Sequence, residues 1–175
     1  MIEIERTFLV KFLPKSLEKC KSKEVFDIYI PKTAKRPSLR IRQNGKKFEI
    51  TKKQQFAESD STNHNEHSIP LTREEFKELS KLDGKKFRKK RYYYPYEGKT
   101  VEIDIYQDKL EGLVLAEFEF KTIAEKNSFK KPYFCIVDIT AEKNRKNGIL
   151  SAKNQTFKEI STKLKKHGYK RIKPT

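Results

Sequence analysis

The sequence predicts an α+β protein that is mainly antiparallel β, with several short helices. Segments in which apolar and charged residues alternate recur along the chain, as expected for strands with two different faces. Asn44-Gly45 is a strong signal for a two-residue hairpin, and helical spacing is confined to short stretches. At 175 residues, we expect one domain over 1–175 with a core of its own.

The first strand is expected within residues 1–11, where Glu3 and Glu5 share one face and Ile2 and Ile4 take the other. A short helix over 14–20 begins with a proline in its first turn. Further strands are expected at 25–30, 38–42 and 48–52. Residues 54–65 are polar and lack periodicity, which predicts a loop.

The second half continues with a strand at 66–71 and a helix that starts at the capping box of Thr72 and Glu75. Three strands at 86–94, 100–106 and 113–120 are expected to form a meander. One more strand is expected at 136–140. The last helix, over about 154–167, would begin at Asn154 and end at Gly168.

Each of several strands carries charges of one sign on one face. The acidic positions are 3/5, 102/104 and 117/119, and the basic positions are 40/42, 52 and 89/91. If the sheet closes into a barrel, these faces can all look inward, the reverse of a small barrel with an apolar interior. Two like charges about 4 Å apart repel by roughly 4 kcal/mol at an effective dielectric of about 20. Such an interior therefore requires divalent cations for its carboxylates and an anion for its basic side chains.

The net charge of +17 also indicates an anionic partner. Cys20 and Cys135 lack the spacing of a zinc or redox motif, so a reducing compartment is the simplest inference. The sequence has no apolar run of the roughly 20 residues that span a membrane, so we expect a cytoplasmic protein without membrane contact. His64 and His67 are expected to be solvated, and the tyrosines at 92–96 are expected to pack rather than stack on nucleic-acid bases.

The opening Glu3-Ile4-Glu5 resembles the ExExK signature of the CYTH domain, the triphosphate tunnel metalloenzymes. Matching segments follow in order: Leu39-Arg40-Ile41-Arg42, Thr51-Lys52, Lys89-Lys90-Arg91-Tyr92, Glu102-Ile103-Asp104, Leu115-Ala116-Glu117-Phe118-Glu119-Phe120 and Asp138-Ile139-Thr140. The resemblance implies an eight-stranded closed tunnel with a charged interior and short helices packed outside. Family members include inorganic triphosphatases, thiamine triphosphatases, class IV adenylyl cyclases and fungal RNA triphosphatases.

The resemblance also implies roles for particular residues. Metal ligands for Mg²⁺ or Mn²⁺ would be Glu3, Glu5, Glu66, Glu102, Asp104, Glu117 and Glu119, of which Glu5, Asp104 and Glu119 would also be catalytic. Phosphate ligands would be Arg40, Arg42, Lys52, Lys89, Arg91 and Lys143. The implied reaction is metal-dependent hydrolysis of a small-molecule triphosphate.

Three positions depart from the family pattern. Thr7 stands where the signature has lysine, which predicts slow turnover unless Lys11 replaces it. Ser68 stands where relatives often have a second carboxylate, and the segment from Glu142 to Arg145 replaces the usual Asp-x-Arg-Tyr. These changes affect rate and substrate choice more than fold.

Inorganic tripolyphosphate is the leading substrate, because no nucleobase pocket is recognisable. The alternatives are thiamine triphosphatase activity, a cyclase-like activity, and a catalytically weak module that binds polyphosphate or nucleic acid through its positive surface. A binding module would show affinity that falls steeply with salt, without turnover and without dependence on divalent metal.

Overall fold

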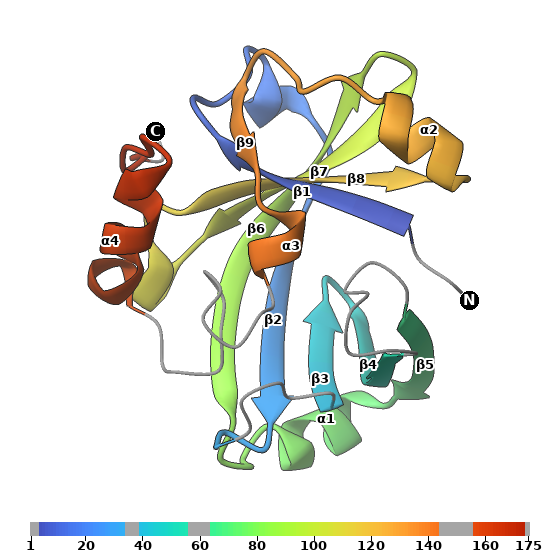
Figure 1. Ribbon diagram of the computed structural model, residues 1–175. Helices are drawn as coiled ribbons and strands as arrows, with labels where there is room; N and C mark the ends of the chain where they lie inside the picture. Colours follow the sequence, from blue (N-terminus) through green and yellow to red (C-terminus); the bar gives the residue numbers. More distant parts are fainter. Residues whose placement is uncertain (1–3, 34–38, 56–63, 144–155, 174–175) are drawn as a thin grey trace.

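The computed structural model describes residues 4–33, 39–55, 64–143 and 156–173, with the backbone alone at 53–55, 64–66 and 142–143. The strands are β1 (Ile4–Val10), β2 (Ser22–Ile30), β3 (Leu39–Asn44), β4 (Lys47–Gln55), β5 (His64–Leu71), β6 (Lys85–Tyr96), β7 (Lys99–Tyr106), β8 (Val114–Phe120) and β9 (Cys135–Asp138). The helices are α1 (Arg73–Leu79), α2 (Ile123–Ser128), α3 (Thr140–Lys143) and α4 (Phe157–Lys166), with 3₁₀ turns η1 (Leu17–Lys19) and η2 (Asp108–Leu110). Figure 1 shows their arrangement.

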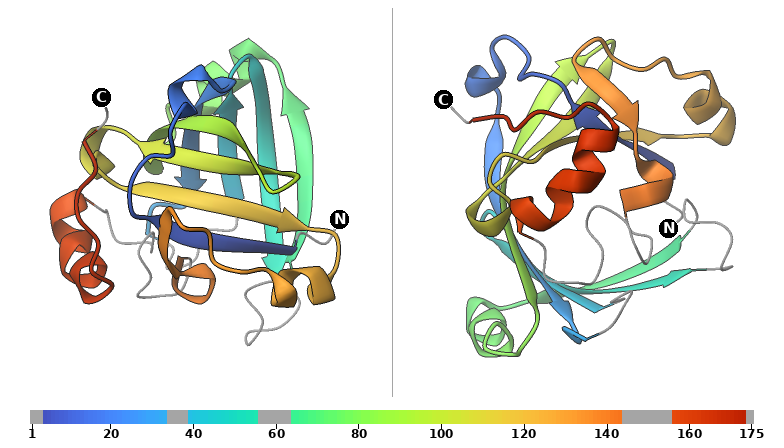
Figure 2. Two further views of the ribbon diagram at one scale, coloured as in Figure 1. Left: turned by 90° about the horizontal axis from the view of Figure 1, so that it is seen from above. Right: turned by 60° about the vertical axis from the view of Figure 1, so that its left-hand side comes forward.

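Within these residues, nine strands form one antiparallel sheet in the order β5-β4-β3-β2-β6-β7-β8-β1-β9. The predicted closed barrel of eight strands is therefore wrong. Closure would require β1 to pair with β5, but β9 occupies that edge of β1. The amide of Ile139 continues this edge by donating to the carbonyl of Thr7. Figure 2 shows the result, a strongly curved open sheet with β1 and β9 on one side and β4 and β5 on the other.

Local sequence signals fix several connections as predicted. Gly45 adopts a φ of 61° in the turn between β3 and β4, a conformation that glycine allows without strain. The capping box at the start of α1 is present, with Thr72 and Glu75 each accepting from the backbone of the other. The helix before β2 is only the 3₁₀ turn η1, and α4 is capped by Thr156 rather than Asn154, which lies outside the described residues.

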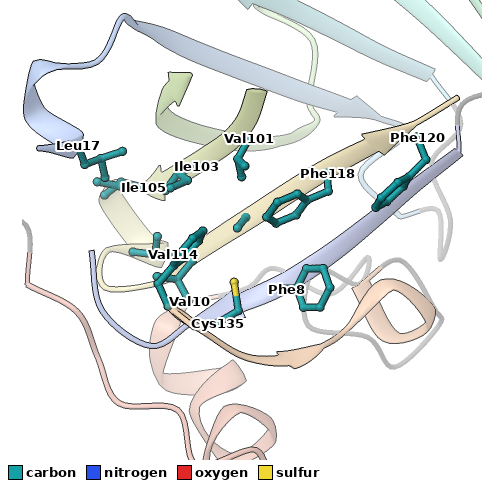
Figure 3. Packing of buried hydrophobic residues seen from close by; sticks show 12 residues of the cluster. Phe8, Val10, Leu17, Val101, Ile103, Ile105, Val114, Phe118, Phe120 and Cys135 are labelled. Atoms are coloured by element: carbon teal, nitrogen blue, oxygen red, sulfur yellow. The ribbon is translucent and has the colours of Figure 1, made fainter. Parts of the chain in front are cut away.

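One face of the sheet is apolar and supplies most of the core. From β1, β7 and β8, side chains such as Phe8, Ile103 and Phe118 form a cluster (Figure 3). Phe134, from the segment before β9, belongs to the same cluster. A second cluster lies under α1, where Phe76 packs on Ile28. The other face carries the charges, and we call it the charged face: it holds Glu5, Thr7, Asp27, Arg40, Arg42, Lys89, Arg91, Glu102, Asp104, Glu117 and Glu119.

The last helix does not pack on the outside of the sheet as predicted. Ile160 and Leu164 of α4 belong to a cluster with Leu9 and Leu115, which lie on the same sheet face as Thr7 and Glu117. In Figure 2 this helix lies beside the end of the sheet where β8 begins. The amphipathic α4 therefore covers one end of the charged face. Among the described residues, no helix is both long and apolar enough to cross a membrane.

Candidate functional site

The strand register brings the predicted acidic residues together from three neighbouring strands. Glu5 of β1 lies opposite Glu119 of β8, and Glu117 of β8 lies opposite Glu102 of β7. Directly opposed residues in an antiparallel sheet share a face and interact, so like charges at these positions repel. The fold therefore concentrates negative charge on β1, β7 and β8, as the alternation of the sequence predicted.

Arg91 of β6 is the centre of a buried ion-pair network. Its Nε donates to Oδ1 of Asp104 at 2.7 Å, and its Nη2 donates to Oδ2 of Asp104 at 2.7 Å and to Oε2 of Glu117 at 3.0 Å. Its Nη1 pairs with Glu102. Lys89 pairs with the same Asp104, whose side chain has no exposed surface. One guanidinium thus holds carboxylates from both β7 and β8.

Burial and charge act in opposite directions in this network. Burial alone would raise the pKa of Asp104, but Lys89 and Arg91 outweigh it and hold that pKa well below its usual range. Burial lowers the pKa of Lys89 against the attraction of Asp104, and the charge of Arg91 lowers it further. For Arg91, the nearby carboxylates outweigh burial and raise the pKa. The network therefore keeps Asp104 ionised and Arg91 positively charged.

Arg42 has a carboxylate partner that the sequence analysis missed, Asp27 of β2. The pairing is bidentate, with Nε to Oδ1 at 2.6 Å and Nη2 to Oδ2 at 2.9 Å, and Asp27 is only 3% exposed. Burial would raise the pKa of Asp27, but the charge and hydrogen bonds of Arg42 lower it to about 2. The available signal was an acidic residue within the otherwise apolar and aromatic run from Val25 to Ile30.

Arg40 extends the basic part of the charged face toward β4 and β5. Its Nη2 donates to the hydroxyl of Thr51 at 3.4 Å, and that hydroxyl lies 2.9 Å from the hydroxyl of Ser68. Glu49 lies 3.9 Å from the same guanidinium. Ser68, where relatives often place a carboxylate, therefore forms a neutral hydroxyl pair with the buried Thr51.

Not every predicted phosphate ligand joins this face. In the strand register, Lys52 lies opposite Leu39 of β3 and His67 of β5. Its side chain is exposed, on the face of β4 opposite to that of Thr51. Lys143 ends α3 and Glu66 lies in β5, but their side chains, like all of Glu3, lie outside the described part of the chain. Lys11 follows β1, is exposed, and lines a surface pocket with Tyr133.

The carboxylates suit a hard divalent cation in their chemistry, since carboxylate oxygen is what Mg²⁺ and Mn²⁺ prefer. Among the side chains that the structure describes, however, no three candidate ligands are grouped closely enough to hold a metal. Arg91 accounts for part of this, because it engages Glu102, Asp104 and Glu117. Glu5 and Glu119, opposed across β1 and β8, are two further predicted ligands on this face. The carboxylates therefore fit a divalent cation in their chemistry. Those that bond to Arg91 would have to release it before they bind the cation.

Tyr92, Tyr94 and Tyr96 of β6 pack as predicted, whereas Tyr93 lies on the charged face opposite Glu102. The ring of Tyr94 contacts Phe134 edge-on at 5.9 Å, and the ring of Tyr96 contacts the same phenylalanine at 5.3 Å. These contacts contribute to the apolar cluster rather than to a free stacking surface.

The family and the fold of the chain are found among known proteins. The family model of the CYTH domain matches residues 1–134. The crystal structure of the inorganic triphosphatase NE1496 is similar, with 26% identity, a TM-score of 0.62, and coverage of 87% of this chain and 95% of that one. A further structure, of the hypothetical protein NE1496, has 27% identity and a TM-score of 0.63, and covers 87% of this chain and 99% of that one. No curated protein sequence matches the chain.

Proposed function

Since the chain belongs to the CYTH domain family, we propose that it hydrolyses a triphosphate, with inorganic tripolyphosphate as the substrate and Mg²⁺ or Mn²⁺ as the cofactor. The observation that carries this proposal is the placement of Arg42, Lys89 and Arg91 on one buried sheet face beside opposed carboxylates. The similarity to an inorganic triphosphatase supports the same reaction class.

The basic residues would bind the phosphates and orient them. Arginine suits this role because its planar fork contacts two phosphate oxygens at once. In the ligand-free protein Arg91 is held by Asp104, Glu102 and Glu117, and Arg42 by Asp27. When the substrate binds, Arg91 would exchange its contacts with Glu102 and Glu117 for contacts with phosphate oxygens. Asp104 would continue to hold the guanidinium of Arg91 in its orientation. The guanidinium would then offset charge that develops on the phosphoryl group.

Glu3, Glu5, Glu117 and Glu119 would hold one divalent cation, and Glu102 and Glu66 would contribute to a second. When bound, the metal would neutralise the phosphate oxygens and increase the reactivity of the attacking water. Metal binding by Asp104 stays a prediction, and it requires this carboxylate to release bonds to Lys89 and Arg91. Because Nη2 of Arg91 lies 3.0 Å from Oε2 of Glu117, the proposed phosphate ligands would lie beside the proposed metal ligands.

Release of phosphate from tripolyphosphate, with Mg²⁺ or Mn²⁺ and with EDTA, tests the proposal. We expect turnover that EDTA abolishes and that Glu119→Gln removes. Glu111→Gln is the matched control, because Glu111 pairs with Arg171 at an exposed site away from the charged face. Activity that persists in EDTA, or equal activity in wild type and Glu119→Gln, would contradict the metal assignment.

Binding measurements separate this proposal from a surface-binding module. Arg42→Ala should weaken tripolyphosphate binding far more than neutralising Lys165 and Lys166 together, because buried charges are less screened by salt than exposed ones. If the two changes weaken binding equally, the positive surface is the binding site, and nucleic acid or polyphosphate becomes the favoured partner. Thiamine triphosphate as a competing substrate tests the other alternative.

A further inference from the structure

Lys85 is a buried lysine on the charged face. It is the first residue of β6 and only 4% exposed. Its Nζ has no hydrogen-bond partner in the part of the chain that the structure describes. Asp83, the nearest acidic residue in sequence, pairs instead with Lys32 at the surface and is 81% exposed. Burial lowers the pKa of Lys85.

The register places Lys85 in line with the basic residues. It lies opposite Tyr29 of β2, and Tyr29 lies opposite Arg40 of β3, so two cations flank one tyrosine on a single face. Lys89 and Arg91 follow on the same face of β6, and Asp27 with Arg42 lies one step further along β2 and β3. The basic part of the charged face therefore reaches beyond the Arg91 network toward the start of β6.

An unpaired ammonium in this position is costly for the ligand-free protein. Removing a charge from water is costly unless a counter-charge or hydrogen bonds compensate for the lost hydration. Nothing in the described residues supplies one to Lys85. An anion that reaches this end of the charged face would supply it.

The length of the basic row decides which anion fits. Four residues separate Lys85 from Lys89, which corresponds to about 13 Å along the strand, and six residues separate it from Arg91, or about 20 Å. A triphosphate, in which a single phosphate joins the two terminal ones, is shorter than this row. A chain held by Lys89 and Arg91 would therefore need further phosphates to reach Lys85.

We propose that Lys85 and Arg40 form an additional phosphate subsite, and that the protein binds linear inorganic polyphosphates longer than tripolyphosphate. This inference rests on the proposed function, since it assumes that phosphates occupy the Arg91 network. Lys89 and Arg91 hold the first three phosphates, and Lys85 neutralises oxygens of phosphates further along the chain.

The test compares binding of tripolyphosphate and of a linear polyphosphate long enough to cover the roughly 13 Å between Lys89 and Lys85, by calorimetry in EDTA, where turnover does not interfere. We expect wild type to bind the longer chain about tenfold more tightly, the gain from one charge-assisted contact. Lys85→Met should keep the affinity for tripolyphosphate and lose this preference. Lys86→Met is the matched control, because Lys86 is exposed on the opposite face of β6 and should leave both affinities unchanged.

Thermal unfolding gives a second readout that needs no ligand. Lys85→Met should raise the melting temperature of the ligand-free protein, because an unpaired buried charge is replaced by an apolar side chain of similar length. Equal binding of both chains by wild type, equal weakening of both by Lys85→Met, or a lowered melting temperature would overturn the inference. Failure of the proposed function would show differently, as no phosphate release from tripolyphosphate by wild type with metal.

Discussion

Asp27→Asn tests whether the buried pair of Asp27 and Arg42 stabilises the fold. The substitution keeps the size of the side chain and removes its charge, which leaves the guanidinium of Arg42 buried beside a neutral amide. Two hydrogen bonds, at 2.6 and 2.9 Å, depend on that carboxylate. Breaking one side of a buried ion pair costs about 3 kcal/mol or more, because the remaining charge has lost its partner.

The pKa of Asp27 gives an independent magnitude. The pairing lowers it from 3.8 to about 2, which corresponds to about 2.5 kcal/mol in favour of the folded state at neutral pH. Because the pKa is lower in the folded protein, this stabilisation is present above the unfolded pKa and disappears as the pH falls through the folded one. About 1 kcal/mol of it should be lost between pH 5 and pH 3.

Urea unfolding of wild type and Asp27→Asn at pH 7, 5 and 3 measures both effects. We expect the free energy of unfolding to fall by about 3 kcal/mol at pH 7 in the variant, and the difference from wild type to narrow toward pH 3. Asp83→Asn is the control, because its pair with Lys32 is exposed and should contribute at most about 1 kcal/mol. Equal losses in the two variants, or a difference that does not change with pH, would refute the reasoning.

Two further changes test the core and the departure at Thr7. Phe76→Ala should lower the free energy of unfolding by about 3 kcal/mol, because Phe76 packs α1 on Ile28 and Ile41; a loss below about 1 kcal/mol in urea unfolding would mean that α1 packs loosely. Thr7→Lys should raise kcat in single-turnover hydrolysis with little effect on binding, because a lysine there would lie on the charged face opposite Glu117. Lys11→Ala should change nothing, and a large loss in that variant without a gain in Thr7→Lys would reverse the assignment.

Local patterns predicted the strands well, because each depends on a few neighbouring residues. Alternation located all nine strands within a few residues, and Asn44-Gly45 identified the turn between β3 and β4. The number of strands in the barrel, in contrast, came from the family resemblance, which implies eight. Whether a sheet closes depends on which strand reaches the free edge of β1, and this is decided by contacts far apart in the sequence, here with β9.

Lys52 shows where the prediction could have been better. It has the same parity along β4 as Phe48 and Ile50, so alternation alone assigns it to the apolar side, where the register places it. The expectation that it binds phosphate followed from its charge and from the resemblance. For Asp27, alternation could predict the sheet face but not the partner. Arg42 lies on another strand, 15 residues away in the sequence.

The position of α4 could not be read from its sequence. An apolar stripe predicts that the helix packs on something, and Ile160 and Leu164 do form such a stripe. The stripe does not predict which face of the sheet the helix packs against. Leu9 follows Glu5 and Thr7 on the charged face of β1, and Leu115 precedes Glu117 on that of β8. These two leucines mark the end of the charged face that α4 covers.

The ion pairs of Arg91 lead to a last expectation, that triphosphate and metal bind cooperatively. In the ligand-free protein Arg91 engages Glu102 and Glu117, which are also the predicted metal ligands. A phosphate that binds Arg91 releases these carboxylates, and a metal that binds the carboxylates releases Arg91, so each ligand removes a cost from the binding of the other.

Calorimetric titration of Ca²⁺, a carboxylate-binding ion, should therefore show tighter binding with tripolyphosphate present. The gain should shrink in Arg91→Lys, because a lysine cannot reproduce the fork that now joins β7 to β8. An unchanged gain in this variant would mean that the coupling comes only from metal bridging to the phosphates.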